Sequence, residues 1–457
     1  ATAETGVTLS RTDAKAFLVD NNTNKTYSVQ LLDDNKLYVY YGDLHRHSIC
    51  GDASCTDSSH KVDVDWTGVS ELTKDMEKGY YYLTADVTLN TQWTPEDGIV
   101  LCLNGHSITA KTEFTAIGIY GRTFTLTDCN GSDGEHYFKN DTKDRWVPCE
   151  KGDTGSFLVE GGVITRVAAY NSGGVLVENG GTFIMYGGTI CGHGGRAGAG
   201  VCANYSKFTM YGGAIKGNSN VDVNYGGGVC VFGSTFTMTG GTISGNKSKS
   251  GGGVYMKNSG VLTIEGGVIS GNNATETGGG VYANVNGEGN IFTVSGEAQI
   301  TGNWTNGTFD SNAKRYVDGE ANNVYLAGSG SNVAPITIGE GLKQNAKIGI
   351  SMGSLPAAGN NVKIATGATS NELNYAEIFP LDMDDQSYSV IRDGKELYIC
   401  LHQHSWGYEV SGSATIKAIC KAKDCPNTNG GSVTIKAPDE LTYDGNAKTA
   451  TLAGAFT

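Results

Sequence analysis

The chain has 457 residues, of which 67 are glycine, and its formal net charge is −14 at pH 7. A chain of this length exceeds one compact domain unless repeats carry it, and its acidic charge argues against nucleic acid and anionic membranes as partners. Its apolar runs are far shorter than the roughly 20 residues of a membrane-spanning helix, so we expect no membrane insertion.

Residues 1–68 are expected to form an N-terminal β segment. Its clearest strands carry Tyr-Ser-Val at 27–29 and Leu-Tyr-Val at 37–39, and near-copies return at 388–390 and 397–399. The opening of the chain therefore resembles the exit of its own repeat region, as if a preceding unit had been cut away. Residues 441–457 look like the start of a further β domain, so we expect a segment of a longer protein.

Each of these strand pairs leads into a His-x-His followed by two cysteines at Cys-x4-Cys spacing. The two sets are His45, His47, Cys50 and Cys55, and His402, His404, Cys420 and Cys425. Two histidines and two cysteines suit tetrahedral Zn²⁺, and four protein ligands would make that zinc structural. The alternative is a local disulfide of a secreted protein beside exposed histidines, and the sequence leaves both open. The odd count of 11 cysteines means that at least one is outside any intrachain disulfide.

A repeat of 25 to 28 residues begins near Tyr80, and residues 226–272 contain almost the same sequence twice. Three apolar positions recur within it. They are the isoleucines 164, 190, 215, 243, 269 and 300, the valines 175, 201, 229, 254 and 281, and the pairs 183/185, 208/210, 236/238, 262/264 and 292/294. Short alternating runs between glycine-rich corners indicate strands rather than helices, and a strand that returns every period stacks on its own copy. The sequence therefore predicts an all-β fold in which residues 69–400 form a right-handed parallel β-helix with a terminal cap.

Asparagine recurs just after the isoleucine strand, at Asn218, Asn246, Asn272 and Asn303. Stacked asparagines in turns hydrogen-bond to the copies above and below them. We interpret this row as a structural ladder rather than a ligand site. Two pairs of cysteines are also one period apart, 102 with 129 and 202 with 230, and the sequence does not decide between disulfides and buried thiols.

Two aperiodic stretches interrupt the repeat, at residues 131–151 and 304–321. Loops ejected from a solenoid often carry specificity. Residues 401–457 are expected to form a separate small β module with a core around Trp406, Tyr408, Ile416 and Ile435.

Catalytic chemistry has little support in the sequence. A glycosidase needs two carboxylates about 5 to 9.5 Å apart, but the acids of the regular coils fall in different registers, as Glu265 does beside tyrosines and threonines. His193 stands alone in the coils near Arg196, and we interpret it as a polar corner residue. No nucleophile elbow, phosphate loop or dinucleotide fingerprint is present.

The remaining candidates form a binding surface. Tyrosines recur in adjacent coils as Tyr186 with Tyr211 and Tyr255 with Tyr282, and their alternation with core residues predicts that both pairs point outward. Places where the repeat breaks add His193, Arg196, Trp146 and Trp304.

Three motifs carry a family resemblance: Val-Leu-Cys-Leu-Asn-Gly-His-Ser-Ile at 100–108, the Gly-Gly-Gly-Val-Tyr coils with Gly-Gly-Thr-Ile-Ser-Gly-Asn, and the tail at 435–450. They resemble large repetitive surface proteins of gut Gram-positive bacteria, and the coils look like those of adhesin β-helices. This resemblance implies a secreted or cell-wall-attached adhesin that binds a host glycan or glycoprotein, and some such proteins capture immunoglobulins. It transfers no catalytic residue. The competing hypotheses are a polysaccharide-active hydrolase or lyase and a passive stalk.

Overall fold

The computed structural model describes residues 27–32, 36–41, 45, 47–49, 66–129, 134–168, 172–195, 198–220, 225–283, 289–329, 332–333, 335–357, 360–383, 387–401, 406–412, 414–421, 429–436 and 451–456. These residues are nearly all in strands and turns, and their one helix is the short α2 (Tyr375–Ile378). The prediction of an all-β protein is confirmed.

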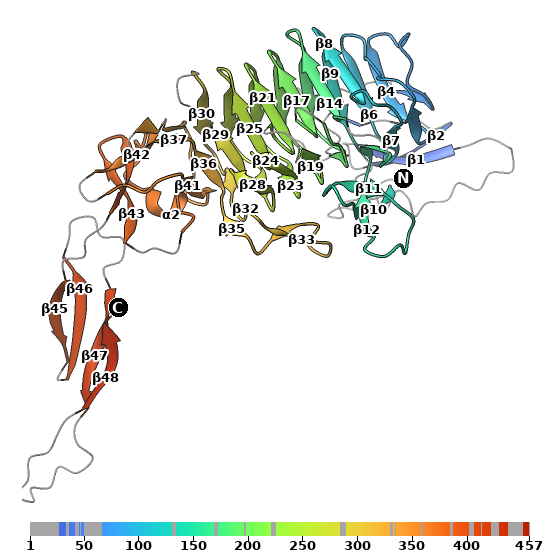
Figure 1. The fold of residues 1–457 in the computed structure, drawn as a ribbon. Coiled ribbons are helices and arrows are strands. Elements are labelled where there is room, and N and C mark those ends of the chain that lie inside the picture. The colour runs from blue at the N-terminus through green and yellow to red at the C-terminus, as the bar shows by residue number, and fades with distance from the viewer. Residues whose placement is uncertain are drawn as a thin grey trace, which may run out of the picture.

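Three large sheets dominate the described residues (Figure 1). Between residues 163 and 300 consecutive strands belong to different sheets, so that each of the three sheets receives one strand from every repeat. The first sheet has the order β3(Thr67–Val69), β4(Gly79–Leu83), β6(Ile99–Cys102), β9(Thr123–Thr127), β15(Thr182–Met185), β18(Lys207–Met210), β22(Thr235–Met238), β26(Val261–Ile264), β30(Ile291–Val294), β39(Ile336–Ile338), β42(Val362–Thr366), β44(Glu396–Leu401) and β43(Tyr388–Asp393). The second sheet contains β5(Val87–Leu89), β7(Ser107–Ala110), β13(Val163–Arg166), β16(Thr189–Cys191), β19(Ala214–Lys216), β23(Thr242–Ser244), β27(Val268–Ser270), β31(Gln299–Ile300) and β40(Lys347–Ile348). The third sheet contains β8(Ile117–Tyr120), β14(Val175–Glu178), β17(Val201–Asn204), β21(Val229–Phe232), β25(Val254–Lys257), β29(Val281–Ala283), β36(Val324–Leu326) and β41(Ile350–Met352).

Along the repeat the strands pair in parallel, each with the copy of itself one repeat away, and this confirms the registers predicted from the sequence. The last strands of the first sheet, β42, β44 and β43, pair antiparallel. Ile190 pairs with Ile215 in the second sheet, and Phe208 pairs with Phe236 in the first. Such stacked apolar side chains are fully buried in one continuous core, where each contributes roughly 1.5–3 kcal/mol. Repeated parallel strands in stacked sheets fit a solenoid-like repeat fold.

The asparagine row predicted from the sequence is present and is fully buried. Asn218, Asn246, Asn272 and Asn303 each donate from Nδ2 to Oδ1 of the next asparagine, at 2.9–3.0 Å, and the row ends at Asn323. A glycine in the left-handed region precedes each of these four asparagines, as Gly245 at φ +65° precedes Asn246. A residue with a Cβ rarely adopts this backbone conformation.

Both ends of this row are capped by other residues. The backbone amide of His193 donates to Oδ1 of Asn218 at 3.0 Å. At the far end, the carboxyl oxygens of Asp382 accept from the backbone and side-chain amides of Asn323, both at 2.6 Å, and from Ser351 Oγ. The row therefore links the regular coils to the turn that follows α2.

The two aperiodic stretches meet on one side of the stack (Figure 1). The earlier one extends beyond its predicted end at residue 151: it forms a small antiparallel sheet of β10(Glu135–Asn140), β11(Trp146–Pro148) and β12(Phe157–Glu160). The later one contains the hairpin β33(Thr308–Asp310)–β34(Arg315–Val317). The rings of Phe157 and Phe309 lie 6.2 Å apart, and Lys314 Nζ donates to the carbonyl of Leu158 at 2.6 Å. Both insertions thus belong to one second apolar cluster.

Shorter sheets complete the described chain. A sheet on this side contains β20(Ser219–Asn220), β24(Lys247–Ser250), β28(Asn273–Thr277), β32(Trp304–Thr305) and β35(Glu320–Ala321), of which β32 and β35 are the two ends of the second aperiodic stretch. In addition, β37(Gly328–Ser329) pairs with β38(Asn332–Val333). The C-terminal sheet contains β45(Trp406–Ser411), β46(Thr415–Cys420), β47(Asn429–Lys436) and β48(Thr451–Phe456), all antiparallel.

The two hairpins that look alike in the sequence have the same register. In β1(Tyr27–Leu32) with β2(Lys36–Tyr41), Val29 pairs with Val39, and in β43 with β44, Val390 pairs with Ile399. The Tyr-Ser-Val segment therefore pairs with equivalent residues of the second strand in both hairpins.

Candidate metal centre and aromatic ladders

Four potential metal ligands from three separate parts of the chain converge beside the first sheet. His45 and His47 follow the hairpin β1–β2, Cys102 ends β6, and Cys129 lies two residues beyond β9. Since β6 and β9 are neighbours in register, with Leu101 opposite Leu126, residues at their ends are brought together by the strand pairing itself. One ligand atom from each of the four residues lies within 4.8 Å of all the others.

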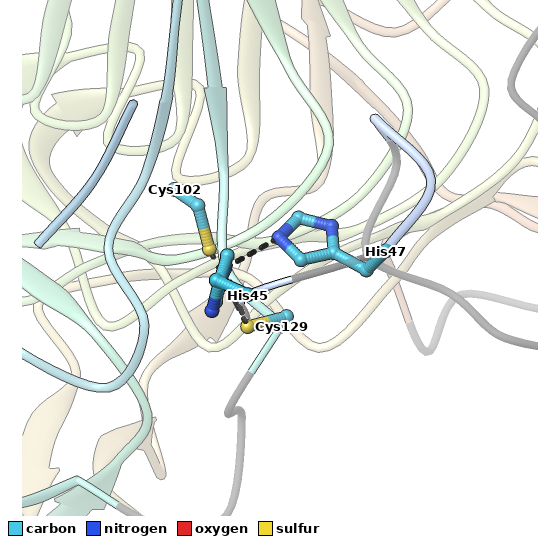
Figure 2. A group of neighbouring side chains, drawn as sticks. All are labelled: His45, His47, Cys102 and Cys129. Atoms are coloured by element: carbon cyan, nitrogen blue, oxygen red, sulfur yellow. Dashed lines mark hydrogen bonds between the residues drawn. The ribbon is translucent and has the colours of Figure 1, made fainter. Parts of the chain in front are cut away.

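The contacts between these ligand atoms are short (Figure 2). The two sulfurs are 3.5 Å apart, Cys129 Sγ is 3.5 Å from His45 Nε2, and that nitrogen is 2.8 Å from His47 Nε2. A disulfide has a sulfur separation of about 2.05 Å, so Cys102 and Cys129 are thiols here.

Aromatic side chains pack against both histidines of the cluster. His45 stacks on Tyr82 with ring centroids 4.1 Å apart, and His47 stacks on Trp66 at 4.2 Å. The indole Nε1 of Trp66 donates to the carbonyl of His47 at 3.1 Å. These contacts hold the short His-x-His segment against the outer side of the sheet, where Trp66, Tyr82 and Cys102 form a small cluster of their own.

The two thiols have opposite electrostatic environments. Burial raises the pKa of the Cys102 thiol well above its ordinary value. A hydrogen bond from Cys102 lowers the pKa of Cys129, and bonds with His45 and His47 lower it further. Cys129 is therefore the sulfur that becomes a thiolate first, and thiolate is the form that binds metals.

The structure joins the predicted histidines to cysteines other than the predicted ones. Cys50 and Cys55 lie outside the described residues, and so do His402, His404 and Cys425, while Cys420 is the last residue of β46. The spacing of one repeat between Cys102 and Cys129 was the sequence signal for their proximity. No such signal in the sequence indicated that His45 and His47 would lie beside these two cysteines.

The two tyrosine ladders differ in exposure. Tyr186 and Tyr211 stack with centroids 4.7 Å apart and an interplanar angle of 9°, and Tyr211 is 43% exposed. Tyr255 stacks on Tyr282 at 5.0 Å and points away from the central core, but it is only 6% exposed. Tyr225 and Phe232 pack edge-on around Tyr255, so a large ligand cannot reach that ring.

His193 is also buried, and its contacts define its protonation. Its Nε2 lies 3.0 Å from the carbonyl of Ile164, which can only accept, and its Nδ1 accepts from Arg166 Nε at 3.2 Å. Burial, followed by the charge of Arg166, holds the pKa of His193 well below its ordinary value. The imidazole is therefore neutral and structural, as the sequence interpretation of a polar corner residue proposed.

The other candidates from the breaks in the repeat are placed as follows. Trp146 is 1% exposed and packs at 4.9 Å from Phe157, so it fills the core of the insertions and offers no surface to a glycan. Trp304 is half-buried in β32, and Arg196 lies outside the described residues.

No protein-family model, curated protein or solved structure matches this chain. Within the described residues, no helix has the length and apolar character needed to cross a bilayer.

Proposed function

We propose that this chain forms a right-handed parallel β-helix that acts as a non-catalytic binding module of an extracellular, secreted or wall-attached bacterial surface protein. Its partner is a host glycan or glycoprotein, with immunoglobulins among the candidates. The observation that carries this proposal is the exposed end of the Tyr186–Tyr211 stack on a rigid sheet face.

Tyr211 combines a packed ring with a large exposed area. One of its faces stacks on Tyr186 with ring centroids 4.7 Å apart, and 43% of the residue is exposed. Aromatic rings with one apolar face and one polar tip are typical of binding surfaces, and a sugar ring presents a matching apolar face.

A pull-down from mucosal secretions tests this function. We expect wild-type protein to recover glycans or glycoproteins, and Tyr211→Ala to recover about tenfold less, equal to the loss of about 1.4 kcal/mol. Phe114→Ala is the matched control, because Phe114 is 70% exposed but lies outside the stack. Recovery of nothing by the wild type would favour the passive stalk. New reducing ends or unsaturated products from added polysaccharides would favour the enzyme.

We also propose that the protein carries one kind of cofactor, a structural Zn²⁺ held through His45 and His47. The observation behind it is the His/Cys cluster described above. Zinc with four protein ligands has no open coordination position, which fits a module without catalysis. Elemental analysis of protein purified without chelator should find zinc, and its absence would refute the zinc.

A further inference from the structure

We infer that His45, His47, Cys102 and Cys129 form one tetrahedral zinc site that fastens the segment after the first hairpin to two neighbouring coils of the solenoid. This inference rests on the structural Zn²⁺ proposed above and assigns its ligands. In place of a local knuckle completed by Cys50 and Cys55, the site spans 84 residues, from His45 to Cys129.

The spacing of the donor atoms fits zinc. With Zn–S bonds of about 2.3 Å and Zn–N bonds of about 2.0 Å, a tetrahedron separates its two sulfurs by about 3.8 Å, its two nitrogens by about 3.3 Å and a mixed pair by about 3.5 Å. The sulfurs of Cys102 and Cys129 are 3.5 Å apart, and Cys129 Sγ and His45 Nε2 are 3.5 Å apart. The two histidine nitrogens, at 2.8 Å, must separate by about half an ångström to admit the ion, and the remaining ligand pairs lie within 4.8 Å of one another.

The orientation of His47 is already that of a ligand. Its Nδ1 lies 2.5 Å from the carbonyl of Ser48, and a carbonyl can only accept, so the hydrogen of the ring sits on Nδ1. The lone pair is then on Nε2, the atom that lies 2.8 Å from His45 Nε2. A hydrogen bond from the second ring nitrogen to a carbonyl is the arrangement that fixes metal-binding histidines in proteins.

The protein also positions the two sides of the site independently. Strand pairing between β6 and β9 fixes the cysteines, whereas stacking on Tyr82 and Trp66 fixes the histidines. Cys102 is fully buried, while His45, His47 and Cys129 are half-buried. The cluster is thus open enough for an ion to enter and dry enough to favour a structural ion.

Zinc and a disulfide compete for the same two sulfurs. A two-electron oxidant such as a small disulfide would join Cys102 Sγ to Cys129 Sγ, release Zn²⁺ and leave two small thiols as the reduced product. Because the sulfurs are 3.5 Å apart, this reaction requires little movement. Measurements of metal content therefore need reduced protein.

Metal content and affinity of the full chain test the ligand assignment. We expect the double variant Cys102→Ser/Cys129→Ser to lose one zinc equivalent, and Cys50→Ser/Cys55→Ser to keep it. The matched control is Cys202→Ser/Cys230→Ser, a second cysteine pair on adjacent strands in direct register with no histidine among the described residues within metal-binding distance. Replacement of zinc by Co²⁺ should give the intense visible bands of a tetrahedral site with thiolate ligands, and these should vanish in the first variant alone.

A milder variant addresses the folding of the double mutant. Trp66→Phe keeps a ring beside His47 but removes the donor to its carbonyl, and it should weaken zinc binding about 10- to 100-fold while retaining the stoichiometry. The inference is overturned if Cys50→Ser/Cys55→Ser loses the zinc and Cys102→Ser/Cys129→Ser keeps it, a result that leaves the structural zinc itself intact. Absence of zinc from reduced wild-type protein overturns both.

The zinc clasp, by which we mean the attachment of His45 and His47 to Cys102 and Cys129 through the ion, also predicts that chelation changes the rate of proteolysis. Removal of zinc should accelerate proteolysis between residues 47 and 66 several-fold in the wild type, because the His-x-His segment is then held only by its contacts with Tyr82 and Trp66. Cys102→Ser/Cys129→Ser should show the fast rate with or without chelator. An unchanged rate after complete zinc removal would exclude the clasp.

Discussion

Replacement of one asparagine in the buried row tests the account of the fold most directly. Asn246 is fully buried and takes part in four side-chain hydrogen bonds. Its Oδ1 accepts from the backbone and side-chain amides of Asn218, and its Nδ2 donates to the carbonyl of Ile215 and to Oδ1 of Asn272, all at 2.9–3.1 Å. Asn246→Ala removes all four bonds and leaves their partners buried.

The expected loss follows from these contacts. At about 1 kcal/mol for each hydrogen bond, Asn246→Ala should lower the free energy of unfolding by about 4 kcal/mol. Asn246→Asp keeps the acceptor but replaces the donor by a second oxygen that faces two carbonyl oxygens, so it should cost at least as much. The exposed Asn312→Ala should stay within about 0.5 kcal/mol of wild type.

Urea unfolding followed by far-UV circular dichroism measures these differences, and hydrogen exchange locates them. The amide of Asn218 should lose protection in Asn246→Ala, because its acceptor is gone. Amides several coils away should be little affected, since a solenoid is stabilised by nearest neighbours. A loss below about 1 kcal/mol, the average for a single hydrogen bond, would show that the four bonds do not contribute as expected.

Three further predictions concern other parts of the stack. Burial raises the pKa of the Asp382 carboxyl above its ordinary value of 3.8. The stability that the protonated carboxyl contributes is therefore fully present below the unfolded pKa and is lost as pH rises through the folded pKa. Urea titrations from about pH 4 upward should show wild type losing stability relative to Asp382→Asn. Gly217→Ala should destabilise by more than 1 kcal/mol, because its φ is +60° and a Cβ would lie 2.1 Å from the ring of Trp146. Phe309→Ala should loosen the hairpin β33–β34 and raise its rate of proteolysis, because it removes the ring that faces Phe157.

Each of these three predictions can be contradicted by a specific result. Parallel pH profiles for wild type and Asp382→Asn would show that the carboxyl does not control this dependence. For Gly217, the control is Gly180→Ala, where φ is +78° but nothing lies within 4 Å of the new Cβ, so equal losses would attribute the effect to backbone strain alone. Unchanged proteolysis of Phe309→Ala would mean that Lys314 holds the hairpin without help from the ring.

The regular part of the fold was predictable because every strand pairs with its own copy. Ile190, Phe208 and Asn218 each lie beside the residue that occupies the same place one repeat later. A period in the sequence therefore translates directly into a contact in space. This is why the registers and the asparagine row follow from spacing alone.

For the same reason, the sequence predicted the proximity of the two cysteines of the candidate site but not the position of its two histidines. Cys102 and Cys129 share the period, but His45 and His47 arrive there by an aperiodic segment whose path depends on packing against Trp66 and Tyr82. Similarly, the stretch that contains Trp146 reads as a polar loop. Its ring is buried because a second insertion, more than 150 residues later, packs beside it.

The buried asparagine row also gives the solenoid a polarity. In every side-chain amide the oxygen accepts from the preceding asparagine, and the nitrogen donates one hydrogen to the oxygen of the following asparagine, so these bonds all run in one direction along the row. The oxygen end faces a backbone amide beside the Arg166–His193 pair, and the nitrogen end faces the acceptor oxygens of Asp382. Since each coil receives and passes on the same pair of bonds, coils can be gained or lost between these ends in whole units without a change in either end.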